Sequence, residues 1–132
     1  MVKTHELSVI VPVYGQFNLA RAYISVQSIL SQKGVNYEII VSEQGEYPRF
    51  PDIQGVRHVF KHHKPKQGLS DFNPGNVRNE GVVFANGEFV YTNDADIVFL
   101  ETDYLAKSIQ EMKNNPNRVL YRPYMRRLPI GE

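Results

Sequence analysis

Two acids, one residue apart, interrupt an apolar stretch in the second half of the sequence. The stretch reads FVYTNDADIVFL over residues 89–100, and Asp94 and Asp96 stand between a strand-like run and a second apolar run. Charge in such a place is costly unless something pairs with it. In an extended chain the two side chains point the same way, so both carboxylates can approach one object. Because hard divalent cations prefer oxygen ligands, the pair indicates a site for Mn²⁺ or Mg²⁺.

A metal at this pair would favour a diphosphate as the ligand. Without a cation, each contact between a phosphate and a carboxylate at about 4 Å costs ~4 kcal/mol at an effective dielectric of roughly 20. With a divalent ion between the two groups, the sign of the interaction reverses. Spacing alone does not decide the matter, because two acids after a strand are also common in turns and as helix caps.

Other nucleotide and metal motifs fail on position. An EF-hand loop counted from Asp94 requires Gly and Glu where the sequence has Phe99 and Leu105. No G-x-G-x-x-G follows the first strand candidate and no G-x-x-x-x-G-K-[ST] occurs, which disfavours dinucleotide-binding and P-loop folds. A nucleotidyltransferase would usually have a Gly-rich, basic loop after the first strand. The sequence there is PVYGQF, which does not fit, so this class of enzyme is a weaker interpretation.

The bulk composition is that of a soluble globular domain. The chain has 132 residues, of which 42% are hydrophobic and 22% charged, and its net charge of +1 gives no argument for nucleic acid or an anionic membrane. No apolar run approaches the roughly 20 residues that span a bilayer, so we expect no transmembrane segment in this chain. Cysteine is absent, which excludes disulfides and thiolate metal sites. We expect a cytoplasmic location, with any contact to a membrane made through other parts of a longer protein.

Strand and helix patterns alternate along the chain, which predicts an α/β fold with a mainly parallel sheet and helices on both faces. Ligands of such sheets bind at the carboxyl ends of the strands, where Tyr14, Glu43 and the two acids fall. We expect strands over residues 7–14, 36–45, 56–60, 88–93 and 117–125, and helices over residues 19–30, 73–85 and 102–115.

Side-chain periodicity predicts which helix residues face the core. In the first helix the inward residues are Leu19, Ala22, Tyr23, Val26, Ile29 and Leu30. The second helix is expected to begin with Asn73 as its N-cap, followed by Pro74. Its inward residues are Val77, Gly81, Phe84 and Ala85.

Three blocks of sequence, taken in order, resemble the nucleotide-sugar half of a family 2-type glycosyltransferase with the Rossmann-like GT-A fold. The blocks are LSVIVPVYGQ, YEIIVSEQGE and NPGNVRNEGVVFANGEFVYTNDADIVF, and the resemblance covers about residues 7–115. Gly15 replaces the usual Asn of the first block, and Gln44 replaces a second acid of the next. In the third block the residues that match are Arg78, Asn79, Gly81, Gly87, Glu88, Asp94 and Asp96.

The resemblance implies a nucleoside pocket at the ends of the first two strands. Pro12, Val13 and Tyr14 would line this pocket. Glu43, in place of the family's Asp, would accept a hydrogen bond from the base, which suggests uridine because its N3–H is a donor. The plainer interpretations are a core aromatic for Tyr14 and a solvated strand-end acid for Glu43.

The same resemblance implies roles at the acid pair. Asp96 would ligate the divalent metal, Mn²⁺ or Mg²⁺, that bridges the diphosphate, and Asp94 would contact the metal or the ribose. Arg78, near the start of a helix, would approach the diphosphate or the ribose. The alternatives are a turn or cap acid for Asp96, a backbone hydrogen bond for Asp94, and an ion pair of Arg78 with Glu80 or Asp71.

Three histidines raise the question of a second metal site. His62 and His63 are adjacent and would point to opposite faces of a strand, so they cannot easily share one ion. We interpret these two and His58 as residues of a solvated loop.

The function implied is transfer of a sugar, of hexosyl type and with inversion, from a UDP-sugar to a glycan or glycoconjugate acceptor. A general base for the acceptor hydroxyl is missing, because the acids after the metal pair surround a helix or end the chain. Residues 1–132 are therefore expected to be a single GT-A donor-binding domain, truncated and without the acceptor half. The alternative is a non-catalytic nucleotide-sugar-binding relative, or an isolated donor-binding fragment without turnover.

Overall fold

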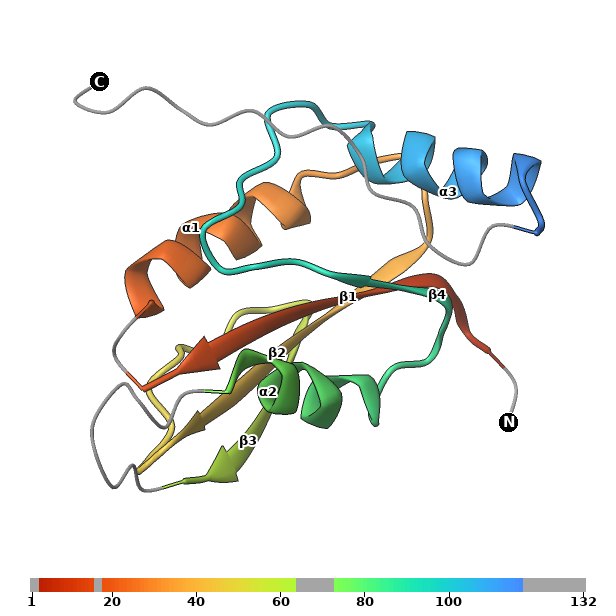
Figure 1. Ribbon diagram of the computed structural model, residues 1–132. Coiled ribbons are helices and arrows are strands. Elements are labelled where there is room, and N and C mark those ends of the chain that lie inside the picture. Colours follow the sequence, from red (N-terminus) through yellow and green to blue (C-terminus); the bar gives the residue numbers. More distant parts are fainter. Residues whose placement is uncertain (1–2, 16–17, 64–72, 118–132) are drawn as a thin grey trace.

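The computed structural model describes residues 3–15, 18–63 and 73–117 (Figure 1). Strands and helices alternate along this part of the chain, as the sequence predicts. The elements are β1 (His5–Tyr14), α1 (Leu19–Leu30), β2 (Tyr37–Gly45), β3 (Val56–His62), α2 (Pro74–Val82), β4 (Gly87–Thr92) and α3 (Tyr104–Asn114). Most of the strand that we expected over residues 117–125 lies outside the described residues.

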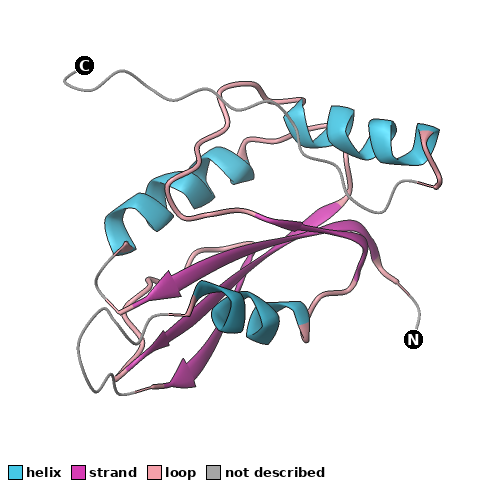
Figure 2. Ribbon diagram, viewed as in Figure 1, coloured by secondary structure: helices cyan, strands magenta, loops and turns pink. Residues whose placement is uncertain are grey.

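Four parallel strands form the sheet in the order β3-β2-β1-β4. Figure 2 shows α2 on one face of the sheet, and α1 and α3 on the opposite side. The expected α/β arrangement is confirmed. Both neighbours of β1 are parallel to it, so the carboxyl ends of these strands lie along the same edge of the sheet.

The central strands β1 and β2 are buried on both faces, which explains their continuous apolar runs. Alternate residues of β1 point to opposite faces. Val9, Val11 and Val13 belong to the main hydrophobic core, together with Val26 of α1 and Leu105 of α3. Ile10 points to the other face, toward α2.

Two core predictions for the helices are wrong. Tyr23 of α1 is 44% exposed, and Phe84, beyond the end of α2, is 40% exposed. The second helix stops at Val82, and a tight turn then brings the Phe84 N–H to the Gly81 carbonyl at 3.1 Å. This turn carries Phe84 out of the core, and its ring lies 5.0 Å from the guanidinium of Arg57.

The N-cap prediction for α2 is confirmed. The Asn73 side chain accepts a hydrogen bond from the Asn76 N–H at 3.1 Å. In the described part of the chain, none of the helices is long and apolar enough to cross a bilayer.

Close packing of α2 on the sheet depends on Gly81. A Cβ atom there would lie 2.7 Å from Ile10 Cγ2 and 3.0 Å from Ser42 Cβ, so α2 would have to move. We therefore expect Gly81→Ala to lower the free energy of unfolding by about 1–3 kcal/mol, measured by urea denaturation.

Gly75→Ala, in the same helix, is the matched control. Its Cβ would meet only Asn73 Oδ1 at 3.4 Å, an ordinary contact, so the change should be neutral or stabilising by up to ~1 kcal/mol. Equal effects of the two substitutions would contradict the close approach of α2 to the sheet.

Candidate functional site

The acid pair lies in a turn that follows β4. The Asn93 N–H donates to the Ile10 carbonyl at 2.8 Å and extends the pairing with β1 by one residue. The Ile97 N–H then donates to the Asp94 carbonyl at 3.0 Å and closes the turn. Ala95 is buried, whereas Asp94 and Asp96 are exposed on either side of it. The turn, rather than an extended strand, thus presents both carboxylates to solvent.

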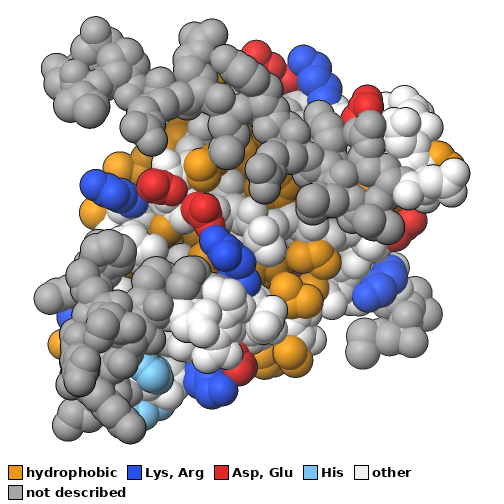
Figure 3. Space-filling view, in the orientation of Figure 1, with side chains coloured by type: hydrophobic (Ala, Val, Ile, Leu, Met, Phe, Trp, Pro, Cys, Tyr) orange, Lys and Arg blue, Asp and Glu red, His pale blue; other side chains and the backbone are white. Residues whose placement is uncertain are grey.

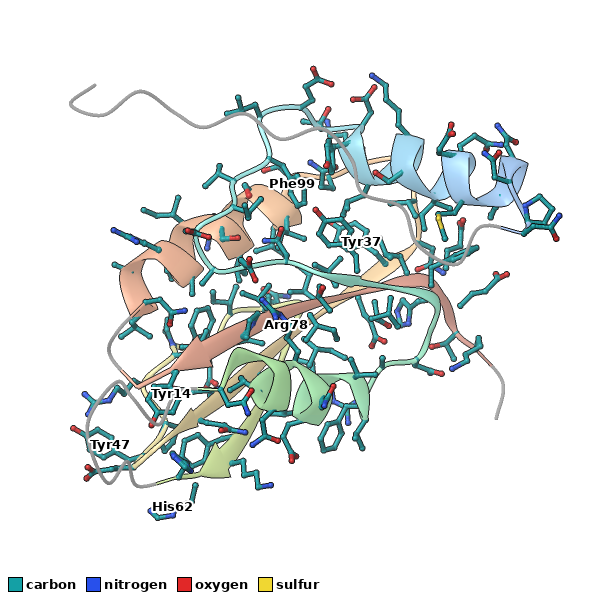
Figure 4. The ribbon with its side chains drawn as sticks, in the orientation of Figure 1. Tyr14, Tyr37, Tyr47, His62, Arg78 and Phe99 are labelled. Atoms are coloured by element: carbon teal, nitrogen blue, oxygen red, sulfur yellow. The ribbon has the colours of Figure 1, made fainter. Side chains whose placement is uncertain are left out.

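Arg78 of α2 reaches this turn. Its guanidinium donates a hydrogen bond to Asp94 Oδ1 and forms an ion pair with it. Figure 4 shows Arg78 between α2 and the segment that follows β4. The alternative partner Glu80 is occupied by Lys61 at 2.8 Å, and Asp71 lies outside the described residues. Arg78 and Asp94, which both belong to the third block of sequence, are therefore in contact in the structure.

One hydrogen-bond donor of the Arg78 side chain is not used within the described residues. Its buried Nε has no hydrogen-bond acceptor within the described part of the chain. A buried donor without a partner is costly in a native structure. An acceptor oxygen of a ligand could satisfy it.

The acid pair fits a hard divalent cation, with further ligands from outside the described residues. Carboxylate oxygens suit Mg²⁺ and Mn²⁺. Over residues 3–15, 18–63 and 73–117, no group of three or more His, Cys, Asp or Glu side chains could hold a metal ion. A cation bound by Asp94 and Asp96 would take its other ligands from a substrate, from water or from residues outside the described part of the chain. Mg²⁺ is usually held by one or two carboxylates together with phosphates and waters.

Tyr91 adds no charge close to this turn. Burial raises the pKa of Tyr91 far above its usual value, and the neighbouring Tyr104 and Asp94 raise it further. The phenol consequently stays protonated and neutral near the acids. Among the described residues, the cationic partner of the Asp94 carboxylate is Arg78.

Glu43 lies at the carboxyl end of β2, and its side chain is completely buried. Its Oε2 accepts a hydrogen bond from the Arg49 N–H at 2.8 Å, and both carboxylate oxygens lie 3.3 Å from the Phe50 nitrogen. Its Oε1 lies 2.6 Å from His58 Nε2. The carboxylate therefore holds the loop after β2 against β3, and its contact with a nucleotide base stays a prediction.

Our interpretation of His58 as a solvated loop residue is wrong. It lies on β3, with a side chain that is 18% exposed and paired with Glu43. Its ring also packs against Phe50, with the ring centroids 6.0 Å apart. The buried acid at the end of β2 accounts for this placement, because a buried charge requires a hydrogen-bonding partner.

The first strand ends beside Glu43. Val13 pairs in register with Glu43, and its side chain lies in the hydrophobic core, so only its backbone can face a ligand. Pro12 and Tyr14 are buried as well. The Tyr14 ring packs against His63, with the ring centroids 5.8 Å apart. The nucleoside-pocket role of these three residues of β1 stays a prediction.

Gly15 explains one departure from the family pattern. Its φ of 53° is left-handed, a conformation in which glycine is unstrained and Asn is tolerated better than most residues. Glycine at this position therefore avoids the strain that most side chains would have there. The Gly15 N–H donates to the Gln44 carbonyl at 2.8 Å, which ties the ends of β1 and β2 together.

A hollow of about 310 Å³ lies between α2 and the strands β2 and β3. Its lining includes Glu80, Phe84, Ser42 and Val59. The Lys61–Glu80 ion pair borders it. Glu43, a residue of the predicted nucleoside pocket, also lines this hollow, whereas Arg78 and the acid pair do not.

Sequence reasoning missed several polar residues that support the site. Asn93 and Ser25 are buried and hydrogen-bonded to each other at 2.8 Å. Ser42 donates to the Val77 carbonyl at 2.6 Å and fastens α2 to β2. The available signal was the position of Ser25, which stands in the sequence between the inward residues Ala22 and Val26 of one helix face.

Comparisons with known proteins agree with this fold. The profile of glycosyl transferase family 2 matches residues 8–128. A Rickettsia felis protein named as an uncharacterized glycosyltransferase is 26% identical over 114 residues, which is 83% of this chain and 18% of that protein. EpsH of Bacillus subtilis, which carries a glycosyltransferase name, is 30% identical over 124 residues, or 90% of this chain and 34% of EpsH.

Comparison with solved structures agrees with the family match. Residues 1–349 of S. aureus TarS superimpose with a TM-score of 0.57 at 20% identity, over 84% of this chain and 33% of that TarS chain. TarS has also been solved in complex with UDP. This likeness confirms the predicted GT-A type of α/β fold. With the family match over most of its length, the chain belongs to glycosyl transferase family 2.

Loss of the buried carboxylate should loosen the loop after β2. We expect Glu43→Ala to lower the free energy of unfolding by about 2–4 kcal/mol, because it leaves two backbone N–H groups and the His58 ring without their acceptor. Chemical denaturation measures the change. Glu46→Ala, which removes an exposed acid three residues later, should stay within about 0.5 kcal/mol. A small effect at Glu43 would show that the carboxylate is not needed to hold the loop.

Proposed function

We propose that this chain is the donor-binding part of a glycosyltransferase, which transfers a sugar from a UDP-sugar to an acceptor hydroxyl. The observation that carries the proposal is the exposed acid turn after β4, with Arg78 paired to Asp94, in a member of glycosyl transferase family 2. The complex of TarS with UDP supports uridine as the nucleoside. The chain spans about a sixth to a third of the length of the relatives that it matches, and in this proposal the full reaction requires a longer protein.

In this proposal Asp96 and Asp94 hold a divalent ion, Mn²⁺ or Mg²⁺. When bound, the ion would offset the negative charge that develops on the leaving nucleoside diphosphate. The turn suits this task because both carboxylates are exposed while Ala95 between them is anchored in the core. Asp94 would bind the metal, the ribose or both.

Arg78 would exchange partners when the donor binds. In the structure it neutralises Asp94, which lowers the cost of two acids one residue apart. Its guanidinium offers several donors in a fixed plane, a geometry that suits phosphate oxygens. The buried Nε, without an acceptor among the described residues, would gain one.

The base that activates the acceptor would come from another part of the full protein. Among the described acids that follow the turn, Glu101 and Asp103 both pair with Lys107 at the start of α3. These pairs make neither acid a good candidate for a general base. Inversion of configuration, a hexosyl donor and a glycan or glycoconjugate acceptor complete the proposal.

A non-catalytic nucleotide-sugar binder is the second candidate. Gln44 in place of an acid, and Glu43 turned to internal partners, favour it. The two candidates differ in turnover. The natural full-length protein should release UDP from a UDP-sugar in the presence of acceptor if it is a transferase, and should bind without release if it is not.

Metal dependence of nucleotide binding tests the proposed site. At UDP about 100-fold above Kd, binding should stabilise the natural protein by ~2.7 kcal/mol, and this stabilisation should require Mn²⁺ or Mg²⁺. A thermal melt with UDP and Mn²⁺, repeated with a chelator, measures it. Asp96→Asn should abolish the effect, whereas Glu88→Gln, an exposed acid at the far end of β4, should retain it. UDP stabilisation that is indifferent to chelator would contradict the proposal.

Arg78→Gln should have opposite effects on the metal and on the nucleotide. Without Arg78 the acid pair is no longer neutralised, and Mn²⁺ alone should bind up to about fivefold more tightly, the range of an exposed ion pair. UDP with Mn²⁺ should bind about tenfold more weakly, because a charge-assisted hydrogen bond is lost.

Isothermal titration calorimetry measures both constants. Arg57→Gln, which removes an exposed arginine that contacts Phe84 instead, is the control and should change neither. Weaker binding of Mn²⁺ alone to Arg78→Gln would argue against the exchange.

A further inference from the structure

The segment between β4 and α3 has neither helix nor strand, yet it carries the acid turn. Buried backbone N–H and C=O groups require hydrogen-bond partners wherever regular structure does not supply them. The side chains that supply several of them come from α1 and the turn that ends it. They are Ser25 and Ser28 of α1, which are neighbours on one helical face, and Gln32, two residues beyond the end of the helix. We call these three residues the polar seam.

The first residue of the polar seam binds the acid turn itself. The Asn93 Nδ2 group donates to Ser25 Oγ at 2.8 Å, and Ser25 Oγ donates to the Ile97 carbonyl at 2.6 Å. The same Nδ2 lies 3.3 Å from the Asp94 carbonyl and 3.5 Å from the Ile97 carbonyl. One buried amide thus contacts both ends of the turn that presents the acids.

The orientation of the Asn93 amide follows from its neighbours. Backbone carbonyls only accept hydrogen bonds, so the NH₂ group has to face Asp94 and Ile97. Asn93 is 1% exposed and Ser25 is fully buried. Asn93 Oδ1 accepts no hydrogen bond from the described residues. A purely structural core position would favour an apolar side chain over an amide that is only partly satisfied.

The rest of the polar seam holds the chain beyond the turn. The Phe99 N–H donates to Ser28 Oγ at 3.1 Å, and the Phe99 ring packs against Tyr104 with centroids 4.8 Å apart (Figure 4). Gln32 donates to the Glu101 carbonyl at 2.5 Å and accepts from the Leu105 N–H at 3.0 Å. The segment between the acid turn and α3 is therefore hydrogen-bonded to α1 and to the turn that follows α1.

We propose that Asn93 and Ser25 are positioning residues for the metal turn. They touch neither carboxylate, and they act by fixing the backbone that carries Asp94 and Asp96. Metal and diphosphate binding require such placement, because ligands that are loose by an ångström lose much of their affinity. Groups that orient metal ligands change affinity by roughly 10–100-fold when they are removed.

This inference rests on the proposed function, since it assigns the turn a metal. The test uses Ser25→Ala in the natural full-length protein, at a temperature where all variants are folded. Ser108→Ala is the matched control: it also removes a largely buried helix hydroxyl, bonded to the Tyr104 carbonyl at 2.9 Å, but one that does not contact the turn. Asn93→Ala serves as the second variant.

Two measurements are made on each variant. Calorimetry gives the Kd of UDP with Mn²⁺, and hydrogen exchange gives the protection of residues 94–99. We expect Ser25→Ala to raise the Kd about tenfold and to speed exchange in this segment, and Ser108→Ala to change neither. A loss of thermal stability without a change in Kd would show a merely structural role and overturn the inference.

The outcomes separate the inference from the proposed function. If wild-type protein binds UDP equally well with chelator, the proposed metal site fails, and the metal role of Asn93 and Ser25 fails with it. If wild-type binding depends on Mn²⁺ but exchange over residues 94–99 is unchanged in Ser25→Ala, the proposed function stands and the inference alone is wrong.

Discussion

The structure depends on how the chain leaves the edge of a parallel sheet without losing its hydrogen bonds. β4 is an edge strand of the sheet and ends opposite Ile10, while β1 continues to Tyr14. Beyond that point the backbone has no ladder to join, and side chains of α1 accept and donate in its place. Because these partners are fixed on a packed helix, the turn with the two acids has a defined position although it is neither helix nor strand.

The acids at the carboxyl edge of the sheet are of two kinds, one buried and two exposed. Glu43 is buried, and its carboxylate is occupied by backbone N–H groups and His58. Asp94 and Asp96 are exposed, and only Asp94 has a cationic partner among the described residues. Burial makes the first carboxylate a fixed part of the scaffold, whereas exposure leaves the other two open to a cation and its ligand. Figure 3 shows acidic and basic side chains next to one another near the middle of the face of the molecule that is in view.

Periodicity was enough to predict the parallel α/β fold and the N-cap at Asn73. The ion pair of Arg78 with Asp94 was not predicted, because the partners considered from the sequence were Glu80 and Asp71. The exposure of Phe84 could not be predicted, because it depends on where α2 stops and how its end turns. Tyr23 lies within α1, beside the buried stripe of Ala22, Ser25, Val26 and Ile29. The partners of Glu43 lie up to 15 residues away in sequence, and those of Ser25 up to 72. Such pairs become neighbours only through the tertiary fold, so a single sequence carried little sign of them.

The most direct test of the account is the location of the metal. Crystals of the natural protein grown with UDP and Mn²⁺ should show an anomalous scattering peak for manganese about 2 Å from an Asp96 carboxylate oxygen, bridging to the diphosphate. Bound UDP without manganese at the acid turn, or manganese at another place, would contradict the claim that this turn is a metal site.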